Sequence, residues 1–255
     1  MAYRRDPDLE FLKKCTSEDL SILVGVLTED TDGETRWTEE LTGNERYKAN
    51  FPNHRVYWDL VAAELQCFGA SSVATIFRGG KGIMYREVLS DVCDKLKVNG
   101  DSQSSVETIE LNLLMKILAD SMEKMTPEQL KEIVGTLDLK TTSYTKQAVV
   151  AALQAGVAMS GFVAYQIAVI VANAVAKAVV GRGLALAANA GLARAVGIFA
   201  GPIGWAVTAV WTLIDVAGPA YRVTMPAVIQ VAFLRAKMNH MPPGQSLKLR
   251  GRDWV

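Results

Sequence analysis

The chain has 255 residues, of which 50% are apolar, so it can bury a sizeable core and general disorder is excluded. Its formal net charge of zero hides a division, because residues 1–140 carry 25 acidic and 17 basic side chains whereas residues 141–255 carry 2 acidic and 10 basic ones. The basic side chains of the second half are mostly isolated and have few aromatic neighbours, which argues against a nucleic acid partner.

The N-terminal region is expected to form short helices. The opening "MAYRRDPDLEFLKK" is too charged for a signal peptide, so we expect no secretion by that route. Asp6-Pro7 predicts a first helix start, and Thr16 with Asp19 predicts a capping box before a second helix. The polar residues 28–55 read as a long connection, and apolar residues from Val56 onward follow the three-to-four spacing of a half-buried helix.

Three further amphipathic stretches complete the first half. They cover residues 82–98, 105–125 and 126–137, and the last begins with Thr126-Pro127-Glu128 as a cap and first turn. No strand pattern of comparable length is present. The sequence therefore predicts an all-α protein in which residues 1–140 form an acidic α-helical domain.

The composition changes abruptly near Thr141, where we place a domain boundary. Residues 147–176 contain no charge in 30 positions, and residues 195–214 contain none in 20. At 1.5 Å per residue these runs reach about 45 Å and about 30 Å, enough to span the hydrocarbon core of a bilayer. Residues 141–255 are thus predicted to form a basic, apolar, Ala/Gly-rich α-helical domain.

The two uncharged runs also carry features that an ordinary membrane span does not need. As one continuous helix, the first run places its polar side chains within an arc of about 140°. These side chains are Gln147, Gln154, Tyr165, Gln166, Asn173 and Lys177. In the second run, Gly201-Pro202 predicts a break between helices 183–200 and 203–216, which would form a hairpin.

Small and aromatic side chains are prominent in this predicted hairpin. Ala193, Gly197 and Gly201 lie four residues apart and would give one helix a flat packing face. The residues expected to matter for packing or for anchoring at a membrane interface are Ala193, Gly197, Gly201, Pro202, Gly204, Trp205 and Trp211. Two interpretations stay open: core helices of a soluble domain, or a conditional hairpin that enters a membrane. Permanent spans fit the polar stripe and Pro202 less well.

A glycine-rich stretch is the one candidate for ligand binding by a loop. In "FRGGKGIMYREV" the residues Arg78, Gly79, Gly80, Lys81 and Gly82 precede a predicted helix, whose first N–H groups attract anions. The stretch lacks the Walker pattern, and a simple helix stop at Gly79-Gly80 with solvated cations explains it better than a ligand site does.

The sequence shows no catalytic constellation. It contains two histidines, His54 and His240, and we expect His54 to act in local capping. Cys15, Cys67 and Cys93 form no C-x-x-C, so neither a disulfide framework nor a zinc site is indicated and a reduced cytoplasmic setting is expected. We predict a protein that is not an enzyme and holds neither a metal nor a cofactor.

Several phrases of the first half resemble a known family. "AYRRDPDLEFLKKCTSEDL", "YWDLVAAELQCFGA", "FRGGKGIMYREVLSDVCDKLKV" and "NLLMKIL" are similar to the YaaW family of uncharacterised bacterial proteins. The resemblance covers most of residues 2–140 and continues more loosely beyond them. It implies a bacterial, largely helical protein, and part of that family also resembles the ubiquinol-cytochrome c chaperone group. It brings no catalytic residue with it.

Two functional hypotheses follow from these observations. The first is a cytoplasmic, membrane-associated or membrane-active bacterial protein whose C-terminal helices insert conditionally at an anionic lipid surface of the inner membrane, with oligomers forming there. The alternative is a soluble chaperone-like protein that binds apolar segments of client proteins.

Overall fold

The computed structural model describes residues 2–29, 40–69, 82–98, 103–181 and 221–240, and in these residues every regular element is a helix, which confirms the all-α prediction. The α-helices are α1 (Ser17–Thr28), α2 (Glu45–Asn50), α3 (Trp58–Gly69), α5 (Tyr85–Lys95), α6 (Val106–Ser121), α7 (Pro127–Thr136), α8 (Lys146–Met159), α9 (Gly161–Val180) and α12 (Tyr221–His240). Short 3-10 helices cover η1 (Glu10–Lys14), η2 (His54–Tyr57) and η3 (Met122–Lys124).

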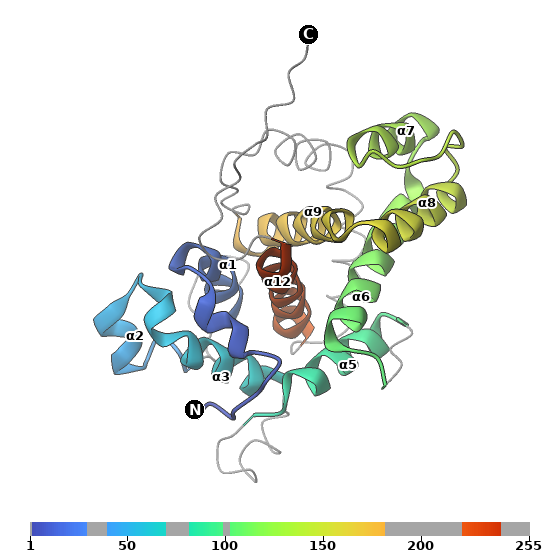
Figure 1. Cartoon of the computed structure of the whole chain (residues 1–255). Helices are drawn as coiled ribbons and strands as arrows, with labels where there is room; N and C mark the ends of the chain where they lie inside the picture. The colour runs from blue at the N-terminus through green and yellow to red at the C-terminus, as the bar shows by residue number, and fades with distance from the viewer. Residues whose placement is uncertain (1, 30–39, 70–81, 99–102, 182–220, 241–255) are drawn as a thin grey trace.

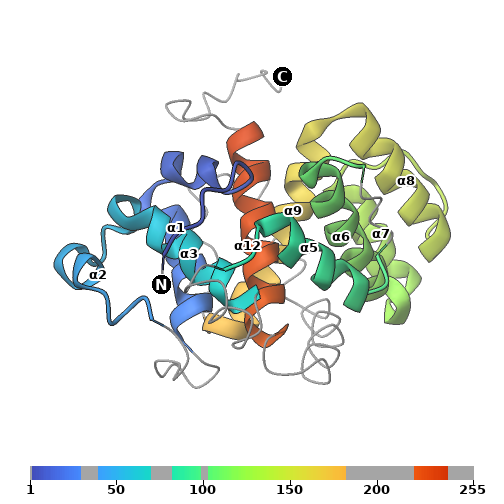
Figure 2. The same ribbon diagram turned by 90° about the horizontal axis from the view of Figure 1, so that it is seen from below.

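Helices α9 and α12 form the centre of the described fold. They pack against each other, and α12 lies between a group made of α1, α2 and α3 and a group made of α5 to α8 (Figures 1 and 2). Nearly all of α9 from Val163 to Ala176 and of α12 from Val223 to Arg235 is buried. One hydrophobic cluster joins side chains from residue 9 to residue 234, so both halves of the sequence contribute to one core. The division into domains 1–140 and 141–255 stays a prediction.

The predicted helix starts are confirmed at two positions. Thr16 accepts a hydrogen bond from the backbone N–H of Asp19, whose carboxylate accepts one from the Thr16 N–H in return. Thr126 does the same with Gln129, and Pro127 occupies the first turn. These signals are local, so they are readable without the rest of the fold.

The expected helix start at Asp6-Pro7 is wrong. Residues 7–9 form a turn, and η1 begins only at Glu10. The fully buried Asp6 carboxylate accepts hydrogen bonds from the backbone N–H of Asp8 at 3.0 Å and of Tyr85 at 2.6 Å. Since Tyr85 is the first residue of α5, Asp6 satisfies the start of a helix that begins 79 positions later.

The predicted single helix across residues 147–176 is also wrong. Ser160 has an extended backbone with φ −152° and ψ 120°, and its side chain accepts a hydrogen bond from the Phe162 N–H at the start of α9. The chain therefore turns between α8 and α9, and the polar stripe calculated for one straight helix does not exist. Instead Gln166 and Asn173 are buried in α9, whereas Gln154 is exposed on α8.

Helix α2 lies in a stretch predicted as a connection. Asn44 caps it by accepting a hydrogen bond from the Arg46 N–H, and the Arg46 guanidinium makes two hydrogen bonds to Asp59 of α3. None of its residues is buried, so its sequence lacks the apolar periodicity that would predict a helix. Its position depends on tertiary contacts.

Candidate functional site

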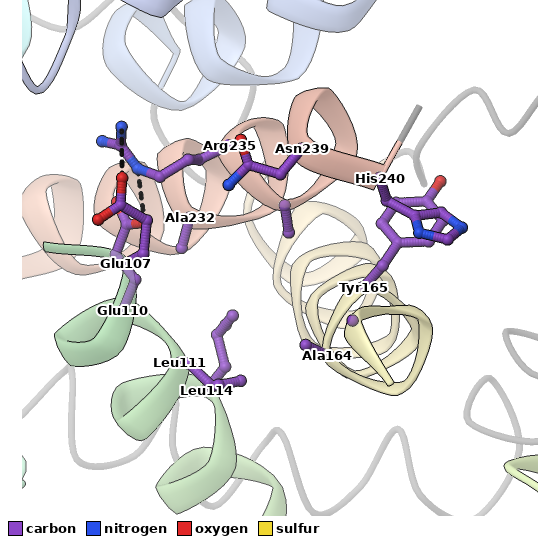
Figure 3. Close-up of a pocket in the computed structure, with 12 residues that line it drawn as sticks. Glu107, Glu110, Leu111, Leu114, Ala164, Tyr165, Ala232, Arg235, Asn239 and His240 are labelled. Atoms are coloured by element: carbon purple, nitrogen blue, oxygen red, sulfur yellow. Dashed lines mark hydrogen bonds and ion pairs between the residues drawn. The ribbon is translucent and has the colours of Figure 1, made fainter. Parts of the chain in front are cut away.

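The candidate site is an apolar pocket of about 220 Å³ enclosed by α6, α9 and α12 (Figure 3). Its apolar walls come from side chains on all three helices: Leu111, Leu114, Ala164, Ala232 and Ala236. Charged side chains lie at one end, and the rings of Tyr165 and His240 lie at the other. The pocket therefore combines an apolar body with two chemically different ends.

Arg235 anchors the charged end from α12. Its Nε donates a hydrogen bond of 2.8 Å to Glu110 of α6, and its side chain is 9% exposed. A second nitrogen donates to the Asp8 backbone carbonyl at 2.6 Å, and the guanidinium lies 4.4 Å from the centre of the Phe11 ring. Because a buried arginine without partners is costly, these contacts fix α12 against α6 and the N-terminal segment.

Glu110 connects Arg235 to Tyr85 of α5. The Tyr85 hydroxyl donates a hydrogen bond of 2.7 Å to one carboxylate oxygen, while the Arg235 Nε donates to the other. Burial raises the pKa of Glu110, although the adjacent Arg235 and the Tyr85 hydroxyl both act to lower it. Burial also raises the pKa of Tyr85 well above its usual value, so this phenol stays protonated and donates. The three side chains thus form one buried hydrogen-bonded chain.

Glu107 is the more accessible acid at this end of the pocket. Its carboxylate lies 4.0 Å from the Arg235 guanidinium, and its side chain is 53% exposed. Arg235 pairs more closely with Glu110 than with Glu107. The Glu107 carboxylate at the rim of the pocket is therefore accessible to water and to a binding partner.

Two aromatic rings, Tyr165 and His240, form the opposite end, and Phe162 packs beside them. The His240 ring stacks on the Tyr165 ring, with 5.1 Å between their centres (Figure 3). The Phe162 ring lies 5.1 Å from the His240 ring and is tilted to it. Burial raises the pKa of Tyr165 to about 12. Phe162 remains 39% exposed, and the neighbouring Met159 at the end of α8 is 83% exposed. An apolar surface therefore continues outward from this end onto α8.

The sequence prediction did not identify this pocket, although two signals for it were present. Glu110 occupies a core position on α6, in line with Val106, Leu113 and Ile117. Arg235 follows twelve consecutive uncharged residues within α12. A lone charge on an apolar helix face indicates a buried pair, but nothing in the sequence says that these two residues meet.

Most of the predicted site residues lie outside the described residues. This is so for Arg78, Gly79, Gly80 and Lys81 of the glycine-rich stretch, and for Ala193, Gly197, Gly201, Pro202, Gly204, Trp205 and Trp211 of the hairpin. Their roles stay predictions.

Gly82 is described, and it packs tightly against α3. A Cβ atom on Gly82 would lie 2.1 to 2.6 Å from backbone atoms of Gln66 and Cys67, and the next N–H, of Ile83, donates to the Gln66 carbonyl. Gly82 does not line the pocket. The glycine is required there because two backbones approach closely.

His54 is the first residue of η2, and its predicted capping role stays a prediction. Its Nδ1 lies 2.6 Å from the Tyr57 hydroxyl and its ring is buried, with no side-chain cap at the start of η2.

Burial raises the pKa of the Cys15 thiol to about 12 and that of the Cys93 thiol to about 11. In the described part of the chain, no three His, Cys, Asp or Glu side chains are placed to hold a metal ion.

One helix among the described residues is long and apolar enough to cross a membrane. It is α9, and 67% of the 18-residue apolar stretch that meets this test is buried inside the protein. Core helices of soluble proteins pass the same length and composition test.

Comparison with known proteins adds family information to this geometry. The family model described as ubiquinol-cytochrome C chaperone matches residues 53–230, and a domain of unknown function, DUF3944, matches residues 3–37. A UPF0174 protein of Helicobacter pylori J99 is 49% identical over 238 residues, which cover 93% of this chain and 94% of the relative. The UPF0174 protein YaaW of Escherichia coli K12 is 34% identical over 242 residues, which cover 93% and 97%.

No solved structure matches the chain. The relatives nevertheless cover nearly its whole length, and the resemblance to YaaW noted in the sequence is confirmed. The chain belongs to the UPF0174 family, of which YaaW is a member, and its residues 53–230 belong to the ubiquinol-cytochrome C chaperone family.

Proposed function

We propose that this protein is a chaperone-like factor that binds apolar segments of a client protein and catalyses no reaction. The match of residues 53–230 to the ubiquinol-cytochrome C chaperone family carries this proposal. The matched range contains α3 to α9 and the first half of α12, and so the pocket-lining residues of α6 and α9, whereas those of α12 lie beyond it.

The surface next to the pocket supports a role in binding apolar segments. Helix α8 buries only Val149 and Leu153, and no charge occurs between positions 147 and 176. Its exposed side includes small and apolar side chains, namely Ala151, Ala155, Ala158 and Met159. Exposed apolar surface of this kind marks interaction sites in soluble proteins.

The pocket supplies an anchoring point at the end of that surface. A volume of about 220 Å³ is enough for one or two large apolar side chains of a client, but not for a whole helix. A client helix lying along α8 would insert an anchor side chain beside Phe162 and Tyr165. Interfaces of this type depend on a few buried anchors surrounded by weaker contacts.

The proposal is tested with a synthetic alanine- and leucine-rich helical peptide carrying a fluorescent label. We expect saturable binding by fluorescence anisotropy, and at least tenfold weaker binding for Met159→Lys/Phe162→Lys, because lysine at an apolar contact must be desolvated. Val56→Lys is the matched control, since Val56 is 45% exposed in η2, outside the pocket lining. Absence of saturable binding to the wild-type protein would contradict the proposal.

Membrane association is a second candidate function, favoured by the length and apolar composition of α9. In that case α9 would leave the core and would enter an anionic bilayer together with the predicted hairpin. Flotation of the untagged protein with vesicles containing phosphatidylglycerol tests this. Binding that resists high salt supports insertion, whereas full recovery in the unbound fraction supports the chaperone-like function alone.

A further inference from the structure

A second, larger groove lies along a neighbouring face of α6. It has a volume of about 520 Å³ and is enclosed by the turn after α5, by α6 and by α8. Leu111 lines both this groove and the pocket described above, so the two are neighbours. We call it the α6–α8 groove.

The walls of the α6–α8 groove are mainly apolar, and its charged side chains are cationic. Val98, Met115, Val150 and Val157 contribute apolar surface, and methionine adapts to irregular ligands. Among the described residues that line the groove, the charged ones are Lys97 and Lys116. Lys116 forms a hydrogen bond of 2.5 Å with Asp120, and no partner of Lys97 is found within the described ranges.

The backbone at Lys97 is in the left-handed region, with φ 54°. The N–H groups of Lys97 and Val98 donate to the carbonyls of Asp94 and Cys93, which is the hydrogen-bond pattern of a Schellman motif at the end of α5. Glycine is the favoured residue at this position, because a Cβ atom makes the left-handed conformation unfavourable. Lys97 therefore stands at a position where glycine would stabilise the end of α5 more.

We propose that the α6–α8 groove binds a single-chain anionic amphiphile, with the chain along the apolar walls and the anionic group at Lys97 and Lys116. The volume lies within the range of small-molecule sites, about 300–1,000 Å³. Two turns of an α-helix with side chains fill more than about 800 Å³, so a protein helix does not fit inside. The described lining holds two lysines and no carboxylate, and because Asp120 already pairs with Lys116, Lys97 supplies most of the positive charge that favours an anion.

Titration calorimetry with laurate below its micellar concentration tests this inference. We expect laurate to bind saturably, and dodecanol and dodecyltrimethylammonium to bind at least tenfold more weakly, because they lack the negative charge. Lauroyl lysophosphatidylglycerol, in a parallel titration, distinguishes a lysophospholipid from a fatty acid as the source of the ligand.

Three variants locate the site. Val157→Trp fills the groove and should abolish laurate binding, and Lys116→Gln should weaken it about fivefold. Lys97→Gly should also weaken it about fivefold, yet raise the melting temperature by about 1–3 °C, since glycine relieves the left-handed backbone. A purely structural lysine would not give these opposite changes. Lys48→Gln on α2, outside the groove lining, is the matched control and should change neither property.

Three results would overturn the inference: no saturable laurate binding, equal binding of all three amphiphiles, or wild-type affinity in Val157→Trp. None of them bears on the proposed client-binding surface, whose test uses Met159 and Phe162.

Discussion

At the scale of single residues, the buried pair of Arg235 and Glu110 is the most consequential feature of the described structure. Their side chains are 9% and 4% exposed, and their hydrogen bond joins α12 to α6 across 125 positions of sequence. A buried ion pair contributes little net stability compared with an apolar pair, but removing one partner leaves a buried charge. The pair therefore fixes the position of α12 more than it stabilises the fold.

Arg235→Met should lower the free energy of unfolding by about 3–5 kcal/mol at pH 7.5, because Glu110 is left buried without its cation. The double variant Arg235→Met/Glu110→Leu should recover part of this loss, since no buried charge remains although the Tyr85 hydroxyl loses its acceptor. Urea unfolding monitored by circular dichroism measures both. Glu107→Gln is the control, with little expected change because Glu107 is half exposed. If the double variant is no more stable than Arg235→Met, the unpaired Glu110 charge is not the cause of the destabilisation.

The loss caused by Arg235→Met should also depend on pH. Burial already raises the pKa of Glu110 above its unfolded value, and loss of Arg235 removes a contact that lowers it. The folded state then binds the proton more tightly, so the free energy of unfolding falls as pH rises through the interval between the unfolded and folded pKa values. The destabilisation should therefore be smaller at pH 5 than at pH 7.5. An equal loss at both pH values would contradict a role for Glu110 ionisation.

At the scale of elements, helix ends decide where α8 and α9 separate. Ser160 serves both helices, because its N–H donates to the Gly156 carbonyl of α8 and its side chain accepts from the Phe162 N–H of α9. The chain turns at Ser160, so α8 and α9 are separate helices (Figure 1). Met159 and Phe162, on the two sides of this turn, are exposed.

Ser160→Ala should lower the free energy of unfolding by about 1 kcal/mol, because α9 loses its N-terminal cap. Ser21→Ala is the matched control, since the partly exposed Ser21 hydroxyl donates to the Glu18 carbonyl within α1 and caps no helix. Chemical denaturation of the two variants in parallel gives the comparison. Equal losses of unfolding free energy in the two variants would mean that the Ser160 cap of α9 does not stabilise the fold measurably.

At the scale of the whole molecule, the acidic and basic halves of the sequence are in direct contact. Lys237 pairs with Asp19, Lys146 pairs with Glu123, and Arg235 pairs with Glu110, each joining a basic residue beyond position 140 to an acidic one before it. Helices α9 and α12 also bury their apolar faces against α1 and α6, and α12 contacts α3 and α5 as well. The acidic first half and the basic second half therefore present complementary charges to each other where they pack around one apolar core.

A fragment of residues 141–255 should accordingly aggregate when expressed alone, because α9 and α12 lose the helices that cover them. Co-expression with residues 1–140 should restore a soluble complex, which size-exclusion chromatography detects. A soluble monomeric 141–255 fragment would show that its apolar helices need no cover from the first half.

The sequence by itself determined the features that depend on neighbouring residues. Capping residues at Thr16 and Thr126, apolar spacing in α6 and α7, and the missing strand pattern predicted the helical class and several helix starts. These signals act over one or two turns, so no distant part of the chain is needed to read them. The same holds for family membership, which long stretches of similar sequence carry.

Only the tertiary structure decided which distant residues meet. Asp6 reads as a local helix cap, yet it binds the first N–H of α5, and Glu110 and Arg235 meet across 125 positions. Whether the uncharged run 147–176 is one helix or two was decided at Ser160, because a turn there lets α9 enter the core while α8 stays at the surface. Burial in the core is a property of the assembled helices, and hydropathy along the chain cannot distinguish a helix covered by protein from one that lipid could cover.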